Sequence, residues 1–209
     1  MDRRAVITRK GVLIMDVSEA IQSRRSIKIF KDIEPISKID VEQLLQAAIM
    51  APNHHRTEPW KFFVLQGDGR LPLSRVMGEW AKTLVDDPNS ESGQKRINKM
   101  MNKPLIAPTI ILVALSHDET GKGIYSEDHS AVAAAIQNIL LEAHGMGYGA
   151  TWKSGPAYEC EPVKSYFNLG DHEEILGAIF IGEADLKKEP VAKRQPFTEK
   201  TVWITEDNQ

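Results

Sequence analysis

The stretch APNHHRTEPW at residues 51–60, continued by KFFVLQ at 61–66, links a predicted helix to a predicted strand and sets the pattern of the whole fold. Ser37 can cap a helix that runs to Met50, where apolar residues recur at helical spacing until Pro52 ends the pattern. Trp60–Gln66 is rich in aromatic and β-branched residues, which is typical of a strand. The loop between them is bounded by two prolines and concentrates polar groups that can bind the carbonyl and ring nitrogen atoms of a ligand.

Helices and strands alternate outward from this stretch. Further helices are expected at Val17–Ser23, across Gly67–Met101 with a break near Asp87-Pro88, at Ser126–His144 and at Glu159–Phe167. Further strands are expected at Ala107–Leu115, Tyr148–Trp152 and Glu174–Gly182, with a short one at Thr201–Thr205. Such alternation predicts a layered helix–sheet–helix domain and, taken alone, favours a parallel sheet.

Two of these segments are apolar enough to predict where they lie. Ala107–Leu115 is a short continuous apolar run, which suits a strand buried on both faces. The helix Ser126–His144 is apolar around much of its circumference, so we expect it to be buried or to lie in a subunit interface.

Length and composition are those of an ordinary globular chain. With 209 residues, 42% hydrophobic and 26% charged, we expect one domain over residues 16–209, preceded by a basic extension or arm over 1–15. No apolar run approaches the roughly 20 residues of a membrane helix, and residues 1–14 lack a signal-peptide pattern. A net charge of −3 argues against a nucleic-acid binder. The single cysteine, Cys160, excludes an internal disulfide and fits a reducing cytoplasm.

Two groups of cations suggest phosphate binding. Arg24-Arg25-Ser26-Ile27-Lys28 places three cations and a hydroxyl directly after the first predicted helix. Arginine offers a planar fork of donors that matches phosphate oxygens, and lysine adds a point charge. In the tail, Arg194 stands two residues before Pro196, where it can complete a phosphate clamp. Each group taken alone is also compatible with a solvated charged turn.

A glycine-rich turn, GMGYGATWKSGP at 145–156, invites comparison with dinucleotide-binding folds. In that fingerprint the glycines follow a strand and open a helix, whereas here they close a helix and lead into a strand. Gly145 is then the expected residue just past the helix end. What remains is Trp152-Lys153-Ser154 at a strand end, which is either a place where the backbone approaches a flat ligand or a plain connection.

The histidines do not form a metal-binding pattern. His54 and His55 are adjacent, and adjacent side chains face opposite ways in an extended chain. No HxxxH or HExxH spacing follows them. We therefore expect no metal site, and a zinc hydrolase that uses His54, His55 and His129 is a weak alternative.

In this order and spacing the motifs resemble those of the nitroreductase family of flavoproteins, in its smaller bacterial branch, over about residues 16–205. Arg24-Arg25-Ser26-x-Lys28, followed by the aromatic Phe30, looks like the opening signature of that family. The 51–60 loop looks like its Ala-Pro-Ser/Asn-x-x-x-x-Gln-Pro-Trp signature. The Trp-Lys-Ser-Gly turn and Arg194 match further family positions.

The resemblance implies an α+β sandwich, with a mostly antiparallel central sheet flanked by helices and FMN at a homodimer interface. The FMN phosphate, ribityl chain and ring edge would be held by Arg24, Arg25, Ser26 and Lys28, with Arg194 closing on the phosphate. The isoalloxazine would lie along Trp152, Lys153 and Ser154. The partner chain would contribute Pro52, Asn53, His54 and Arg56.

Two positions depart from the family pattern. Glu58 stands where the family commonly has Gln, and an acid there would repel an anionic substrate. His54 and His55 replace small polar residues of the larger branch, which alters the contacts near the flavin.

The implied activity is that of an FMN-dependent oxidoreductase. It would take a hydride from NADH or NADPH and pass it to a nitroaromatic, a quinone or another small electron-poor acceptor. The donor and the acceptor would bind in turn, in a ping-pong scheme. The flavin N5 carries this chemistry, so no side chain is expected to act as a nucleophile. Donors near N1 and O2, with Lys28 or Lys153 as candidates, would favour the reduced flavin. The alternatives are a flavin store or sensor without turnover, and a related flavin reaction such as enone reduction or dehalogenation.

Overall fold

The computed structural model describes residues 15–32, 34–188 and 190–205. Of the predicted extension at residues 1–15, only Met15 falls within these ranges, and the rest lies outside the described residues. Within the described ranges no helix is both long and apolar enough to cross a membrane.

Four strands form the central sheet: β1 (Trp60–Gln66), β2 (Thr109–Ser116), β3 (Gly149–Lys153) and β4 (Glu173–Gly182). Their order in the sheet is β1-β2-β4-β3, and each neighbouring pair of these strands is antiparallel. The mostly antiparallel sheet that the resemblance implied is confirmed, and the parallel sheet favoured by alternation alone is wrong.

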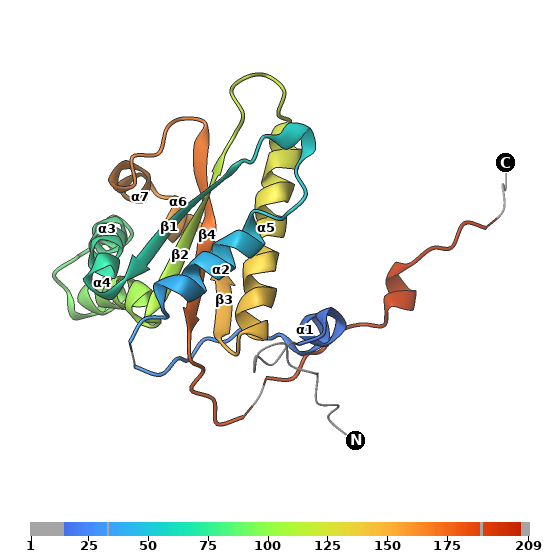
Figure 1. Cartoon of the computed structure of the whole chain (residues 1–209). Helices are drawn as coiled ribbons and strands as arrows, with labels where there is room; N and C mark the ends of the chain where they lie inside the picture. The colour runs from blue at the N-terminus through green and yellow to red at the C-terminus, as the bar shows by residue number, and fades with distance from the viewer. Residues whose placement is uncertain (1–14, 33, 189, 206–209) are drawn as a thin grey trace.

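The connection between β1 and β2 shows why alternation misleads. It contains two helices, α3 (Leu71–Lys82) and α4 (Glu91–Asn102), rather than one. These two helices pack against each other as a hairpin (Figure 1). They bring the chain back to the end of the sheet that it left, as the pairing of Gln66, the last residue of β1, with Thr109, the first residue of β2, shows. A single crossover helix would instead deliver the next strand in the parallel direction.

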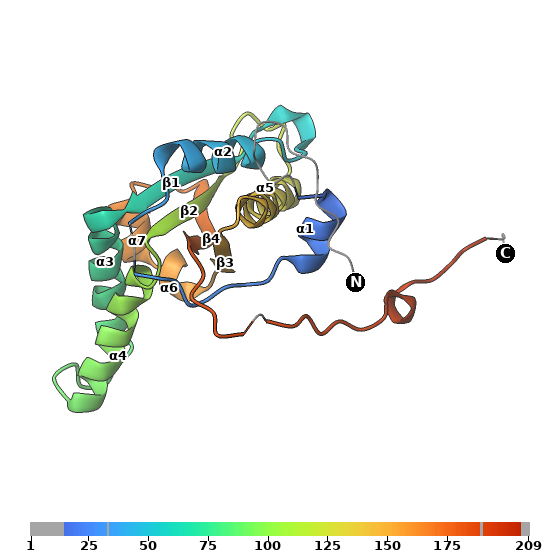
Figure 2. The same cartoon turned by 60° about the horizontal axis from the view of Figure 1, so that its bottom comes forward.

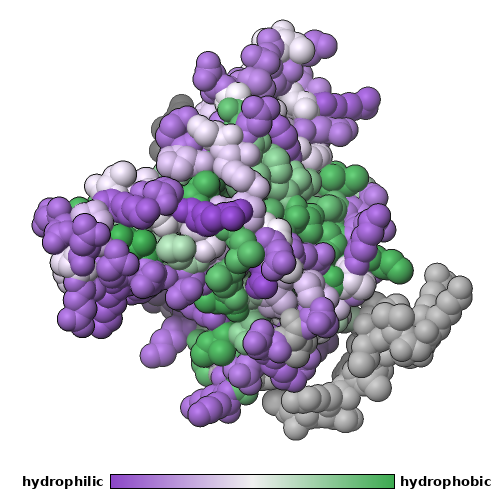
Figure 3. Space-filling view, turned by 90° about the vertical axis from the view of Figure 1, so that its left-hand side faces the viewer, coloured by the Kyte–Doolittle hydropathy of each residue, from purple (hydrophilic) through white to green (hydrophobic). Residues whose placement is uncertain are grey.

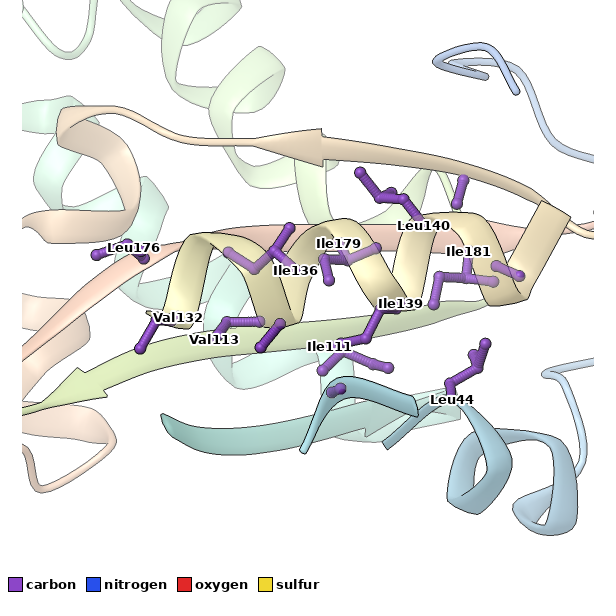
Figure 4. Packing of buried hydrophobic residues seen from close by; sticks show 14 of the residues in the cluster. Leu44, Ile111, Val113, Val132, Ile136, Ile139, Leu140, Leu176, Ile179 and Ile181 are labelled. Carbon is purple, nitrogen blue, oxygen red and sulfur yellow. The ribbon is translucent and has the colours of Figure 1, made fainter. Parts of the chain in front are cut away.

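One face of the sheet is covered by α2 (Lys38–Ala48) and α5 (Tyr125–Gly145), with α1 (Val17–Ser23) packed beside α5. Figure 4 shows the core on this side, where Ile136 and Ile139 of α5 meet Ile111 of β2 and Ile179 of β4. All four side chains are fully buried. The predicted burial of this long helix is thus confirmed.

The other face is covered by α3, α6 (Pro156–Glu159) and α7 (Glu161–Tyr166). Strand β2 contributes alternate residues to the two faces: Ile111 and Val113 to the α5 side, Ile110 and Leu112 to the α3 side, all with 0% exposure. The prediction of a strand buried on both faces is confirmed. Figure 3 shows the side of the molecule opposite the C-terminal arm, where hydrophilic side chains surround separate apolar patches.

In the described ranges, three short 3₁₀ helices lie at connections, η1 (His54–Arg56), η2 (Gly67–Arg70) and η3 (Lys103–Leu105), and η4 (Phe197–Lys200) follows β4 near the C-terminus. After β4 the chain passes the α1 end of the molecule and extends away from the body as a C-terminal arm (Figure 2). The strand expected at Thr201–Thr205 is absent, because this exposed segment lies in the arm, away from the sheet that would pair with it.

Two helix boundaries also differ from expectation. The helix expected at Glu159–Phe167 is divided at Cys160, because Pro162 has no N–H to donate to the carbonyl four residues earlier. Helix α5 runs through Gly145, and Gly147, with φ of +86°, is the left-handed residue past its end. Gly145 therefore does not have the role predicted for it.

Candidate functional site

The segment that follows α1 runs along the outer edge of β3. Ser26 forms a parallel bridge with Ala150, and the Ile27 N–H donates to the Ala150 carbonyl at 3.0 Å. Ile27 is buried against Gly149, where an added Cβ would lie 2.9 Å from Ile27 Cγ2. Since neighbours in an extended segment point to opposite sides, burial of Ile27 leaves the residues on either side of it exposed.

Three guanidinium groups gather at this end of the molecule. Partial burial lowers the pKa of Arg24, and the like charges of Arg25 and Arg194 lower it further. Arg25 Nη1 donates to the carbonyl of Gln22 at 2.6 Å, while Arg25 Nε is buried without a hydrogen-bond partner. A buried donor without a partner is destabilising. An anion placed among the three groups would relieve both the repulsion and the unpaired donor.

Three lysines form the adjoining part of the same region. Burial lowers the pKa of Lys153, and the nearby charges of Lys103 and Lys28 lower it further. The Lys153 Nζ lies 4.3 Å from the centroid of the Phe180 ring, which holds this ammonium against the sheet. Lys103 was not among the predicted residues, since no motif surrounds it. The one feature of the sequence that could have suggested Lys103 is its position shortly before the buried strand β2.

We call these six side chains the cation cluster: Arg24, Arg25, Lys28, Lys103, Lys153 and Arg194. None of them forms a salt bridge with a carboxylate in the described part of the chain. Burial and mutual repulsion both disfavour such an arrangement unless an anion binds to it. The cluster therefore fits a ligand that carries a phosphate and a polar ring edge.

An exposed aromatic side chain, Trp152, adjoins the cation cluster at the end of β3. The Trp152 indole, 39% exposed, donates through Nε1 to the Leu176 carbonyl at 3.3 Å. It packs against Gly177, where an added Cβ would lie 2.3 Å from that nitrogen. Beyond the exposed Ser154, Gly155 has φ of +113° and no atom within 4 Å of the position of a Cβ. The backbone at this turn is thus open to a planar ligand.

The loop at Pro52–Glu58 is held in an unusual conformation. His55, Arg56 and Glu58 all have positive φ, at 55°, 54° and 46°. Each such residue costs about 1–3 kcal/mol and persists only where its surroundings hold it. Two contacts with the first turn of α5 do so: His54 Nδ1 lies 2.5 Å from Glu127 Oε2, and Thr57 Oγ1 donates to Asp128 Oδ1 at 2.6 Å.

The same loop forms one wall of a pocket of about 410 Å³. Pro52, Asn53 and His54 line one side, and α5 supplies the other through Glu127, Ser130, Ala131 and Ala134. The rings of His54 and His55 stack with their centroids 3.7 Å apart. The expectation that these two side chains face opposite ways is wrong, because the backbone here is a strained 3₁₀ turn rather than an extended chain. Within the described ranges, no three His, Cys, Asp or Glu residues are placed to hold a metal ion.

The two groups of predicted site residues lie at opposite ends of α5 (Figure 1). Ser23, next to the cation cluster, has its Oγ 2.8 Å from His144 Nε2, whereas His54 contacts Glu127. These two positions on α5 are 17 residues apart, or about 25 Å at the usual rise of a helix. A single chain thus brings together the cation cluster, Ser26, Trp152 and Ser154, but it does not bring Pro52–Arg56 to them.

Comparison with known proteins connects this geometry to a family. Residues 21–183 match the family model described as "Nitroreductase family". A Bacillus subtilis (strain 168) protein named as an NAD(P)H nitroreductase, YfhC, is 32% identical over 183 residues, which cover 87% of this chain and 91% of that protein.

Two solved structures share the fold over almost their whole length. A nitroreductase-like family protein from Bacillus cereus is 29% identical, with a TM-score of 0.76, and the match covers 92% of this chain and 97% of that one. A Desulfovibrio desulfuricans protein, described as a nitroreductase in complex with FMN, is 25% identical, with a TM-score of 0.64 and coverage of 91% and 98%.

Proposed function

Since this chain belongs to the nitroreductase family, we propose that it is an FMN-dependent oxidoreductase that uses NADH or NADPH to reduce small electron-poor acceptors. The observation that carries the proposal is the cation cluster, six cations without a carboxylate partner in the described ranges, beside the exposed Trp152 indole and the open turn at Gly155. A related protein was solved with FMN bound. When bound, FMN supplies hydride transfer through its N5 atom.

The residues of one chain fit the two polar ends of FMN. Arg24, Arg25 and Arg194 carry the donors for a phosphate, and the buried Arg25 Nε is one donor that such an oxygen would satisfy. The three lysines of the cluster would face the polar edge of the ring, where positive charge stabilises the anionic reduced form. Trp152 and Ser154 would lie along the ring plane.

We infer a homodimer in which each site is built from both chains. The loop with Pro52, Asn53, His54 and Arg56 contacts one end of α5 at Glu127, and the segment before the cation cluster contacts the other end at His144, about 25 Å along the helix. The loop would therefore reach a flavin at the cation cluster of a partner rather than at that of its own chain. A two-fold axis that paired the α5 helices in opposite directions would bring each loop toward the partner's cation cluster.

The C-terminal arm supports the same assembly. Four large apolar side chains of the arm are exposed by 70–86%: Phe197, Val202, Trp203 and Ile204. They extend away from their own domain (Figure 2) and would bury this surface against a second copy. The free thiol of the buried Cys160 fits a reducing cytoplasm as the location.

The acceptor would be neutral or cationic rather than anionic. Glu58 and Glu127 both lie at the loop end of α5, and like charges repel an anionic substrate. Nitroaromatics and quinones meet this condition. The scheme is ping-pong, because the nicotinamide and the acceptor use the same open face in turn.

Visible absorbance tests the proposal most simply. The purified protein should show flavin absorbance that NADH or NADPH bleaches, and a nitroaromatic or quinone should restore it. Flavin without bleaching would instead indicate a store or sensor without turnover. An enone or halogenated acceptor that restores the colour faster than a nitroaromatic would favour the related flavin reactions. A protein that binds no flavin would contradict the proposal.

A further inference from the structure

The pocket at the N-terminal end of α5 holds a side-chain pair, His54 and Glu127, to which the proposed function assigns no chemical step. His54 Nδ1 lies 2.5 Å from Glu127 Oε2, and both side chains are partly exposed, at 56% and 41%. An isolated exposed ion pair adds little stability. Here, however, both members line the pocket of about 410 Å³ beside apolar side chains. The pair is therefore placed against the space that a small ligand would occupy.

Two contacts fix the orientation of the His54 imidazole. An ionised carboxylate only accepts hydrogen bonds, so Nδ1 carries the hydrogen shared with Glu127. The ring also stacks on His55, with an angle of 25° between the planes. These contacts occupy Nδ1 and one face of the ring. Nε2 has no hydrogen bond to the described residues and remains able to carry a second proton.

We propose that His54, held by Glu127, is the proton donor to the acceptor during its reduction. The inference rests on the proposed function, because it needs an acceptor that receives a hydride beside this loop. Reduction of a quinone consumes one hydride and one proton, and reduction of a nitro group to a nitroso group consumes the same and releases water. His54 Nε2 supplies the proton, and the neutral ring that remains is reprotonated from solvent.

The surroundings of His54 favour this role. Glu127 faces the ring from α5, and His55 and Arg56 follow it in the same loop. The neighbouring Asp128 is directed elsewhere, since its carboxylate accepts from Thr57 Oγ1 and lies 2.7 Å from His117 Nδ1. The contact with Glu127 fixes the ring and leaves its second nitrogen directed away from that carboxylate.

The test compares two acceptors in one variant, His54→Gln. A quinone needs a proton to complete its reduction, whereas the cation ferrocenium takes a single electron and no proton. We expect reoxidation of the reduced enzyme by the quinone to fall about 10²-fold at pH 7, and the loss with ferrocenium to be at least tenfold smaller, roughly in line with general acid catalysis.

The matched control is His129→Gln, which removes an exposed histidine of α5 that does not line the pocket. Ring ¹⁵N chemical shifts give a readout without turnover: His54 should hold its hydrogen on Nδ1, and Glu127→Ala should release this fixed tautomer. Equal losses with both acceptors, a quinone rate that matches the control, or an unfixed tautomer would overturn the inference. If the wild type binds no flavin, the proposed function fails, and this inference fails with the function on which it rests. If the wild type turns over and only the two-acceptor difference is missing, this inference alone fails.

Discussion

Gly177 is the residue on which the position of Trp152 depends most directly. Its φ of +151° lies in a region that residues with a side chain rarely adopt, and an added Cβ would lie 2.3 Å from Trp152 Nε1 and 2.5 Å from the Lys153 carbonyl oxygen. For Gly177→Ala, the backbone strain costs about 1–3 kcal/mol. Displacement of the indole and the carbonyl costs about 1–3 kcal/mol more. We therefore expect the free energy of unfolding to fall by about 2–6 kcal/mol.

Urea unfolding, followed by tryptophan fluorescence, measures this loss. In a chain of this length the Tm should fall by at least about 4 °C, and FMN retention should weaken, because Trp152 and Lys153 move together. Gly69→Ala is the matched control, since no atom lies within 4 Å of its added Cβ. That variant should stay within about 1 kcal/mol of the wild type. If Gly177→Ala were as stable as the control, the packing described for Trp152 would be refuted.

Three further outcomes are expected. Lys28→Ala should weaken FMN binding by about 10–100-fold, as for a lost charged contact, or slow flavin reduction; unchanged flavin occupancy and reduction rate would remove its role. Asp128→Ala should destabilise the fold by about 2 kcal/mol or more, because the part-buried Thr57 Oγ1 and His117 Nδ1 both lose their partner; urea unfolding with no loss would contradict this. Hydrogen bonds from Thr120 and then the Gly123 N–H lower the pKa of Asp118 from 3.8 to about 2. A lowered pKa stabilises the fold above the ordinary value, and this stabilisation is lost as the pH falls through about 2. The Gly123 amide should therefore stay protected from hydrogen exchange at pH 4 and lose protection toward pH 2; early loss would contradict the hydrogen bonds.

Local patterns were sufficient to predict most elements of the fold. Trp60–Gln66 is a strand with the predicted bounds, and Ser37 caps α2 through a hydrogen bond from the Asp40 N–H. The direction of neighbouring strands could not be predicted from the sequence in the same way, because it depends on whether one or two helices fill the connection between them. Gly145 and Gly147 are both chemically suited to a helix end, and the packing of α5, rather than composition, selects Gly147.

Residues of the candidate site could be predicted from the sequence only where they belong to a motif. The cations after α1 could be found because they are adjacent in sequence, and Arg194 because it matches a family position. Lys103 joins them only through folding, when the α3–α4 hairpin returns the chain to the sheet. The pair of His54 and Glu127 joins residues 73 apart, so no local pattern reveals it.

The claim that each site takes its parts from two chains can be tested by mixing two defective variants. One variant carries Arg24→Ala and Lys28→Ala, and the other carries Asn53→Ala and Arg56→Ala, so each homodimer should lose FMN. In a heterodimer of the two, a composite site predicts that one of the two positions is intact, with about one FMN bound per dimer by flavin absorbance. A folded heterodimer that binds no FMN would show instead that both groups of residues act within a single chain.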